Sequence, residues 1–188
     1  LWQLTEAANN YRMAIKIKPN FAPAYNNFAV TLKSLNKLDE ALTNCKKAID
    51  LKPDLIDAHN NLGAILKDLN RFEESCESFR KAIELNKDYT EAYYNLGIVL
   101  KKIGKIDESV ENYKKAIITN PNYYKAYSNY LFNLNYLTKY DDQYYISAAK
   151  DFGHNLKKIK NSLCSHYQYE ENPEKIKIGF VSGDFKEH

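Results

Sequence analysis

The sequence is poor in the residues that interrupt regular structure, with only six glycines and five prolines among 188 residues. Folds built of many short strands need both residue types at close intervals, so an all-β fold is disfavoured. No apolar run reaches the ~18–20 residues that a membrane-spanning helix requires. With 44% hydrophobic and 27% charged residues, the composition is typical of a globular protein rather than of a disordered or collagen-like chain.

Arginine is also scarce, occurring only at Arg12, Arg71 and Arg80. The net charge of +3 arises from lysines that alternate with acidic residues along the chain. A nucleic-acid-binding protein usually gathers its basic residues on one face and reads base edges with arginine. The sequence therefore predicts neither a nucleic-acid partner nor a membrane partner.

The three cysteines, Cys45, Cys76 and Cys164, are far apart and form no C-x-x-C pair. An odd and unpatterned set in a chain of this length indicates reduced thiols, which predicts a cytoplasmic location. The histidines have no partners at metal-ligand spacing, so we expect no metal site. His59 lies in an aromatic packing column and is interpreted as a core residue.

Internal repetition is what the sequence has in abundance. Ala-Ile pairs, large apolar residues, small residues and aromatic residues each recur at a step of 34 residues, which is the period of the tetratricopeptide repeat. The four columns are Ala14, Ala48, Ala82 and Ala116; Phe28, Leu62, Leu96 and Tyr130; Ala29, Gly63 and Gly97; and Tyr11, Cys45, Phe79 and Tyr113. This period predicts a mainly α superhelical solenoid of paired helices.

The columns have a direct physical meaning. A small residue at Gly63 or Gly97 lets two helices approach closely, and large side chains then fill the notch beside Ala82 or Ala116 of the partner helix. One helix pair cannot bury its apolar face alone, so neighbouring repeats must stack. Prolines at three of the four repeat ends stop the second helix: Pro19, Pro53 and Pro121, with Lys87 as the exception.

We place the repeats at residues 1–137. They comprise a half repeat to about residue 21, three full repeats and a further first helix. The full repeats are 22–55, 56–89 and 90–123, and the further helix is 124–137.

The register fails after residue 137. Leu131 already replaces the small residue, and the continued count places Gln143, Ser147 and Lys150 at core positions. Apolar spacing still predicts a helix near 141–157, which we expect to cap the solenoid.

Residues 138–173 are thus interpreted as a capping helix and a connector. Residues 174–188 change to a period of two, which predicts a strand near 176–181 followed by a glycine-containing loop. A single strand is not stable alone, so we interpret 174–188 as the start of a truncated α/β, Rossmann-like domain.

The first candidate binding site is a column of asparagines at the same step of 34: Asn27, Asn61, Asn95 and Asn129. Each lies on the first helix of its repeat, which we expect to line the concave face. A carboxamide offers both donors and an acceptor, so a row of them matches the backbone of an extended peptide. The alternative is that these asparagines serve only helix packing or solvation.

The second candidate is His188, which follows the predicted strand by a short loop. Ligands of α/β folds bind at the carboxyl ends of strands, and a histidine there is suited to act as a general base or to bind a phosphate. A loop histidine that is simply exposed to solvent is the plain alternative.

Taken together, these features resemble the protein O-GlcNAc transferases and their SPINDLY-like relatives. The resemblance rests on the repeats with their concave asparagines, on AYSNYLFNLNY (126–136), and on KIKIGFVSGDFKEH (175–188), which is similar to the first strand and loop of the catalytic region. It implies that the repeats bind a protein acceptor and that a sugar passes from a nucleotide-sugar, UDP-GlcNAc first, to a Ser or Thr hydroxyl. It also implies no metal or other cofactor, and His188 matches the active-site histidine.

Two alternatives remain open at this point. SPINDLY-like members share the strand and the histidine, which leaves a protein O-fucosyltransferase that uses GDP-fucose. The other is a non-enzymatic scaffold of tetratricopeptide repeats. The nucleotide-binding part of the catalytic region is not among these residues, so we expect the 188-residue chain itself to be inactive.

Overall fold

The computed structural model describes residues 2–137 and 141–160. Every regular element in these two ranges is an α-helix. The helices are α1 (Trp2–Ile17), α2 (Ala22–Ser34), α3 (Leu38–Leu51), α4 (Ile56–Asp68), α5 (Phe72–Leu85), α6 (Thr90–Lys102), α7 (Ile106–Thr119), α8 (Tyr124–Leu134) and α9 (Asp142–Lys160).

The first helices of the repeats begin at the predicted interval. α2, α4, α6 and α8 start at residues 22, 56, 90 and 124, so the prediction of a helical solenoid is confirmed. The helix expected near 141–157 is also present, as α9. The strand predicted near 176–181 and the loop that carries His188 lie outside the described residues.

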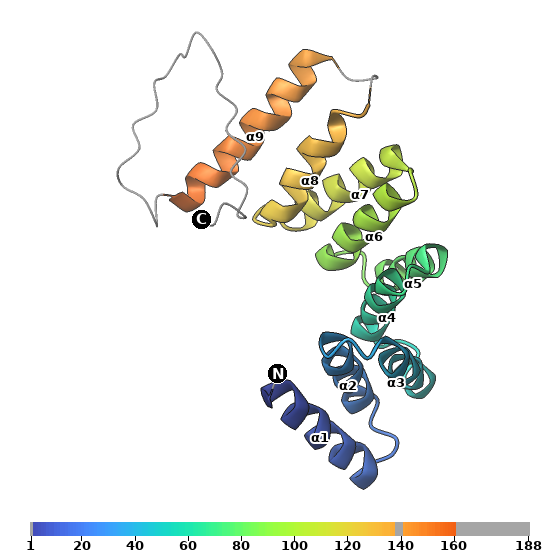
Figure 1. Cartoon of the computed structure of the whole chain (residues 1–188). Coiled ribbons are helices and arrows are strands. Elements are labelled where there is room, and N and C mark those ends of the chain that lie inside the picture. Colours follow the sequence, from blue (N-terminus) through green and yellow to red (C-terminus); the bar gives the residue numbers. More distant parts are fainter. Residues whose placement is uncertain (1, 138–140, 161–188) are drawn as a thin grey trace, which may run out of the picture.

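The helices pack in pairs, α2 with α3, α4 with α5 and α6 with α7, and each pair packs on the next. α2 also contacts α4, and α4 contacts α6, across the intervening helices. First helices that touch one another in this way form the inner layer, with α3, α5 and α7 outside. Figure 1 shows the resulting open arc, in which α1 and α9 lie at opposite ends.

The turn within each helix pair repeats its backbone conformation. Asn36, Asn70 and Gly104 stand 34 residues apart, and all three have positive φ, at 58°, 58° and 80°. Asparagine and glycine tolerate this left-handed region better than other residues. The turn therefore recurs at the same point of each repeat, and it sets the second helix at the same angle to the first.

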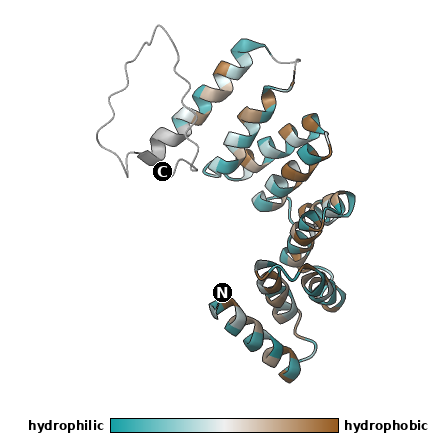
Figure 2. Ribbon diagram, viewed as in Figure 1, coloured by the Kyte–Doolittle hydropathy of each residue, from teal (hydrophilic) through white to brown (hydrophobic). Residues whose placement is uncertain are grey.

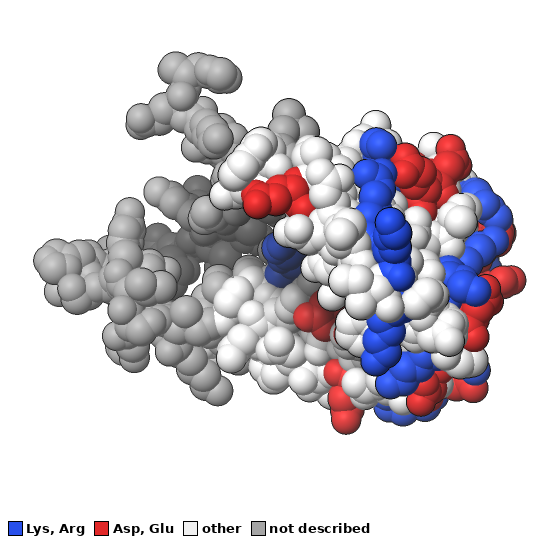
Figure 3. Space-filling view, turned by 90° about the horizontal axis from the view of Figure 1, so that it is seen from below, with Lys and Arg blue, Asp and Glu red and all other residues white. Residues whose placement is uncertain are grey.

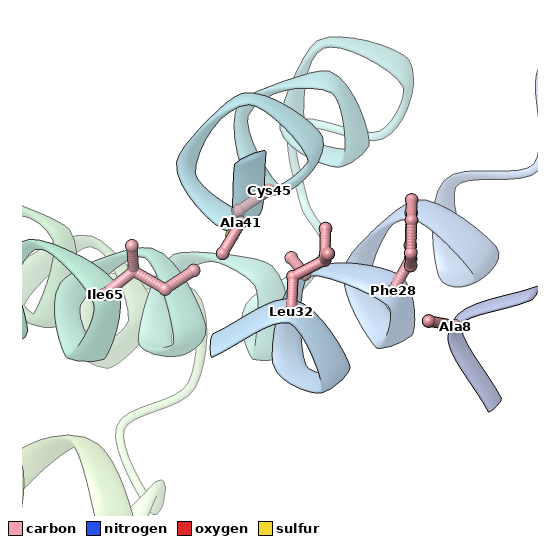
Figure 4. Packing of buried hydrophobic residues seen from close by; sticks show 7 residues of the cluster. Ala8, Phe28, Leu32, Ala41, Cys45 and Ile65 are labelled. Atoms are coloured by element: carbon pink, nitrogen blue, oxygen red, sulfur yellow. The ribbon is translucent and has the colours of Figure 1, made fainter. Parts of the chain in front are cut away.

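Buried hydrophobic residues form clusters along the array, and Figure 2 shows apolar residues on helices throughout it. Close to the first repeat, Ala8, Phe28, Leu32, Cys45 and Ile65 pack together although they come from four different helices (Figure 4). Burial raises the pKa of the Cys45 thiol to about 12, which keeps it protonated. Cys45 and Cys76 are both free and buried.

The glycines at the small position allow very close helix packing. A Cβ atom on Gly63 would lie 2.7 Å from Cε1 of Phe79, and one on Gly97 would lie 2.7 Å from Cε1 of Tyr113. The aromatic ring of the second helix thus fills the space that the glycine leaves. This is the notch that the sequence predicted. The Oγ atoms of Ser75 and Ser109 donate to the carbonyls of the same glycines, both at 2.7 Å.

α9 contacts α8 much less extensively than α7 contacts α6. It is held mainly by aromatic side chains. The Tyr130 and Tyr144 hydroxyls are 2.8 Å apart, and the hydroxyl of Tyr145 donates to the carbonyl of Leu134. The rings of Tyr127 and Phe152 stack at 5.2 Å. A cleft of about 330 Å³ remains between α7, α8 and α9.

Candidate binding groove on the inner helices

The inner helices present three parallel columns of side chains along the concave face. On each helix the column residues are spaced three apart, which keeps them on one side of the helix. The first column holds the predicted asparagines, the second holds apolar residues and the third holds lysines. They are Asn27, Asn61, Asn95 and Asn129; Val30, Ala64, Ile98 and Phe132; and Lys33, Lys67 and Lys101.

The asparagine column is linked from repeat to repeat by hydrogen bonds. From Asn61 onward, each Nδ2 of the column donates to the residue 35 positions earlier, on the preceding inner helix. Asn61 donates to Oδ1 of Asn26 at 2.9 Å, Asn95 to Oδ1 of Asn60 at 3.2 Å, and Asn129 to the hydroxyl of Tyr94 at 3.3 Å. The structure therefore brings these residues together into one ladder, and part of each carboxamide is used to join neighbouring repeats.

The ladder leaves hydrogen-bonding groups available toward the groove. A carboxamide has two N–H donors and a carbonyl acceptor. At Asn61 and Asn95, within the described part of the chain, only one donor is engaged, and both side chains are partly exposed. Asn27 is exposed and accepts a hydrogen bond from Asn26 at 3.4 Å. One N–H and one C=O are the groups that complement a peptide unit.

The lysine column is paired with a carboxylate at its first two positions. Nζ of Lys33 lies 2.9 Å from Oδ2 of Asp68 on the next inner helix, and Nζ of Lys67 lies 3.5 Å from Oδ1 of the same carboxylate. Partial burial tends to raise the pKa of Asp68, but the hydrogen bond and charge of Lys33, together with Lys67, lower it below its ordinary value. One carboxylate is thus shared by two cations.

The third lysine has aromatic neighbours instead of a carboxylate. Nζ of Lys101 lies 4.2 Å from the ring centroid of Phe132 and 5.9 Å from that of Tyr136. The two rings meet edge to face at 5.6 Å, and they are 43% and 59% exposed. Cations are attracted to aromatic faces at such distances, so this end of the groove carries an ammonium group on an open aromatic surface.

Sequence reasoning found the asparagine column but missed the lysine column and the partners Asn26, Asn60 and Tyr94. Both signals were available, since these residues also recur at a step of 34. They were missed because lysine on a helix surface and asparagine beside another asparagine are ordinary features when each is considered alone. Only the inner position of α2, α4 and α6 makes them neighbours in one groove.

The other residues considered from the sequence play structural parts where they are described. His59 is buried, and its Nε2 lies 2.8 Å from the carbonyl of Pro53, which confirms the core interpretation. Asp39, Glu73 and Asp107, with the glutamate that follows each, occupy the first turns of α3, α5 and α7, where acids stabilise the helix dipole.

Charge and metal ligands give no other site in the described ranges. Seen from the α1 end, a line of lysine and arginine side chains runs beside acidic ones (Figure 3). Across residues 2–137 and 141–160, no cluster of three or more His, Cys, Asp and Glu side chains is placed to hold a metal ion. No helix in these ranges combines the length and apolar content needed to cross a bilayer.

Models of the tetratricopeptide repeat match most of the solenoid. Residues 31–69 and 64–104 match one described as a TPR repeat, and residues 90–123 and 10–43 match two described as tetratricopeptide repeats. The matches together span residues 10–123, so the chain belongs to the tetratricopeptide-repeat family over this range. No curated protein matches it in sequence.

Solved structures of several repeat proteins are similar to the chain. A crystal structure of MamA matches with a TM-score of 0.70 at 24% identity. The match covers 84% of this chain and 90% of the MamA chain. The first TPR domain of Spaghetti (RPAP3), bound to an HSP90 peptide, has a TM-score of 0.61 at 22% identity, with 63% and 94% covered.

A mutant of the Thermobaculum terrenum O-GlcNAc transferase is also similar, with a TM-score of 0.63 at 22% identity. It covers 71% of this chain, whereas the chain covers only 26% of the transferase. Likeness at these identities establishes a shared repeat fold. The described residues hold repeats and α9, and the match to the transferase is a match of helices.

Proposed function

We propose that the chain binds an extended segment of a partner protein along the inner face of the solenoid. The observation that carries this proposal is the carboxamide ladder, in which Asn61 and Asn95 each keep one N–H and the C=O available beside an apolar column. Helices pack about 8–10 Å apart, and an extended chain advances ~3.3–3.6 Å per residue. Successive asparagines therefore meet a peptide about every third residue and read its backbone rather than its side chains.

The similar structure of a TPR domain bound to an HSP90 peptide supports the same use of the fold. Each neutral hydrogen bond contributes only about 0.5–1.5 kcal/mol net. Single Asn→Ala changes are therefore expected to have mild effects, while the combined change of Asn27, Asn61, Asn95 and Asn129 to Ala is expected to weaken binding by about tenfold or more. A suitable probe is a set of fluorescein-labelled, unstructured Ser/Thr-rich peptides measured by fluorescence anisotropy.

The control must separate binding from the inter-repeat bonds that the same asparagines make. Asn60→Ala combined with Tyr94→Phe removes the acceptors of Asn95 and Asn129 but keeps both carboxamides. We expect this control to retain peptide affinity, with its melting temperature lowered about as much as that of the quadruple variant. Unchanged affinity in the quadruple variant would mean that the column is structural only.

A protein glycosyltransferase is the second candidate, with the groove delivering the acceptor segment. It is supported by the similarity of residues 175–188 to the first strand and loop of such enzymes and by the transferase among the structures with the same repeat fold. In this proposal His188 accepts the proton of the acceptor Ser or Thr hydroxyl, or binds the leaving diphosphate. UDP-GlcNAc is the proposed donor, and GDP-fucose is the alternative.

The test is an assay of the full-length protein with labelled UDP-GlcNAc and then with GDP-fucose. If His188 is a general base, His188→Ala should lower turnover by roughly 10²-fold and leave the melting of the solenoid unchanged. Wild-type turnover in that variant would remove His188 from the mechanism. Lack of transfer from either donor would favour the scaffold that binds a protein segment without modifying it.

A further inference from the structure

The lysine column changes its surroundings between the second and third repeats. Lys33 reaches the residue 35 positions ahead, Asp68, and forms an ion pair with it. The equivalent residue ahead of Lys101 is Tyr136, and the residue that follows Lys101 on its own helix is Lys102, where the second repeat has Asp68. In the third repeat, therefore, neither the residue 35 positions ahead of the lysine nor the residue that follows it has a carboxylate.

No other carboxylate compensates for this loss in the described part of the chain. Lys101 forms no ion pair there, while Lys33 and Lys67 share Asp68. The ammonium of Lys102 lies 5.4 Å from the ring centroid of Phe72, at the start of α5. The column lysines of α2 and α4 thus share a carboxylate, whereas the column lysine of α6 has none in the described residues.

The aromatic pair gives the free cation a defined place. Phe132 lies on α8 and Tyr136 lies just after its end, and both rings lie near the ammonium of Lys101 on α6. Large exposed aromatic side chains next to an unpaired charge are unusual on a surface without a partner. Together they present a cation for a carboxylate and an apolar surface for the side chain beside it.

We propose that Lys101, Phe132 and Tyr136 form a specificity subsite for an acidic residue adjacent to a large apolar residue in the bound segment. The inference rests on the proposed function, and it adds side-chain selection at one end of a groove that otherwise contacts backbone. Charge complementarity selects the occupant, because Lys101 is the one lysine of the column that no carboxylate contacts in the described residues, whereas Lys33 and Lys67 both contact Asp68. The segment accordingly lies with its acidic residue at α6 and α8 and with its neutral part toward α2.

The test compares two labelled peptides that differ only in one residue, Glu-Leu against Gln-Leu, within the same Ser/Thr-rich sequence. We expect the Glu peptide to bind the wild-type chain about fivefold more tightly at low salt. This preference should shrink as the ionic strength rises, because exposed charges are screened. Lys101→Gln should abolish the preference for the Glu peptide over the Gln peptide.

Two matched variants separate the subsite from general charge effects. Lys67→Gln removes a lysine from the same column in the preceding repeat, where Asp68 already balances it, so the Glu preference should persist. Lys102→Asp places a carboxylate next to Lys101 as Asp68 stands next to Lys67, and it should abolish the preference with Lys101 intact. Loss of the preference in Lys67→Gln, or its survival in Lys101→Gln, would overturn the assignment.

Three further outcomes of the binding test would also count against the subsite. Equal binding of the two peptides by the wild-type chain would remove the subsite and leave the groove proposal standing, whereas absence of binding by both would remove the two together. A single-stranded oligothymidylate that binds through Lys101 more tightly than the Glu peptide would identify a nucleic-acid site and overturn the peptide assignment.

Discussion

The helix pairs α6–α7 and α8–α9 follow one another in the chain, but they are packed by different means. In the first pair, Gly97 leaves room for the ring of Tyr113, and the hydroxyl of Ser109 donates to the glycine carbonyl. In the second pair, the equivalent positions carry Leu131, Ser147 and Gln143. A large residue has replaced the glycine and a small one has replaced the aromatic ring, so the two surfaces no longer fit.

The looser packing of the second pair is visible in the structure. α7 packs along α6, whereas α9 contacts α8 less and is held by tyrosine hydroxyls and stacked rings. A cleft stays open between α7, α8 and α9, with Ser147 among its lining residues. The comparison shows that three positions in each helix pair, rather than overall hydrophobicity, decide whether two helices close completely.

The first repeat reaches close packing with a different combination. Ala29, Ala41 and Cys45 occupy the positions that hold glycine, serine and an aromatic residue in the second and third repeats, and all three are fully buried. The larger Ala29 is matched by the smaller Cys45. The first repeat thus replaces a glycine and an aromatic ring by two residues of intermediate size.

A large loss of stability is expected when the close approach of the two helices is broken directly. Gly97→Ala introduces a Cβ 2.7 Å from the Tyr113 ring, and overpacking of this kind costs about 1–3 kcal/mol. Gly153→Ala is the control, because a Cβ there meets no atom within 4 Å, and it should be neutral or stabilising by up to about 1 kcal/mol. Urea unfolding followed by circular dichroism measures both, and equal stability of the two variants would contradict the packing account.

Volume compensation can be tested by copying the first repeat into the third. Tyr113→Cys alone should destabilise the chain by about 2–4 kcal/mol, since it leaves a cavity. In that background Gly97→Ala should cost at least about 1 kcal/mol less than it does in the wild type, because the ring it would strike is absent. A double-mutant cycle by urea unfolding gives this coupling energy, and a value near zero would show that the two positions do not interact.

A smaller effect of opposite sign is expected at Asn133, which stands where Ile65 and Val99 stand in earlier repeats. Asn133 is fully buried, and its Oδ1 has no hydrogen-bond partner, although its Nδ2 donates to Ser109 at 3.1 Å. An unsatisfied buried acceptor costs about 1–3 kcal/mol. Asn133→Val should therefore stabilise the chain by about 1 kcal/mol in thermal or urea unfolding, and Val99→Asn should destabilise it.

The smallest effect is expected at the Asp68 ion pair, which distinguishes α4 from α6 on the inner face. The pKa of Asp68 is lowered in the folded chain, chiefly by Lys33 acting against partial burial. Its contribution is therefore present above the unfolded pKa and is lost as the pH falls through the folded pKa. Asp68→Asn should cost less than about 1 kcal/mol at neutral pH, and the difference from wild type should vanish in acid. A difference independent of pH would show that packing, not charge, is responsible.

The sequence was sufficient to predict the helices because the same few positions repeat. The starts of α2, α4, α6 and α8 follow from the 34-residue columns, and the failure of those columns at Leu131 anticipated an irregular end. The aromatic side chain that packs against each glycine could not be predicted from these columns. Gly63 indicates a close approach, but which side chain enters the space, Phe79, depends on the angle between two helices.

The candidate groove was predictable only in part, for a related reason. The asparagine column shows a regular step along the sequence, yet its hydrogen bonds join residues 35 apart, from one repeat to the next. The same offset links Lys33 to Asp68 and places Tyr136 beside Lys101. Such contacts depend on how one repeat is stacked on the next, which the period alone does not specify.

The loose attachment of α9 has a consequence for how the molecule opens. Because each repeat contacts only its neighbours, local unfolding free energies vary along a solenoid instead of being shared by all its parts. The helix pairs closed by Gly63 and Gly97 then form the slowest-exchanging segment in amide hydrogen exchange. α9, which lacks that closure, opens first and leaves the inner face of α2 to α6 folded.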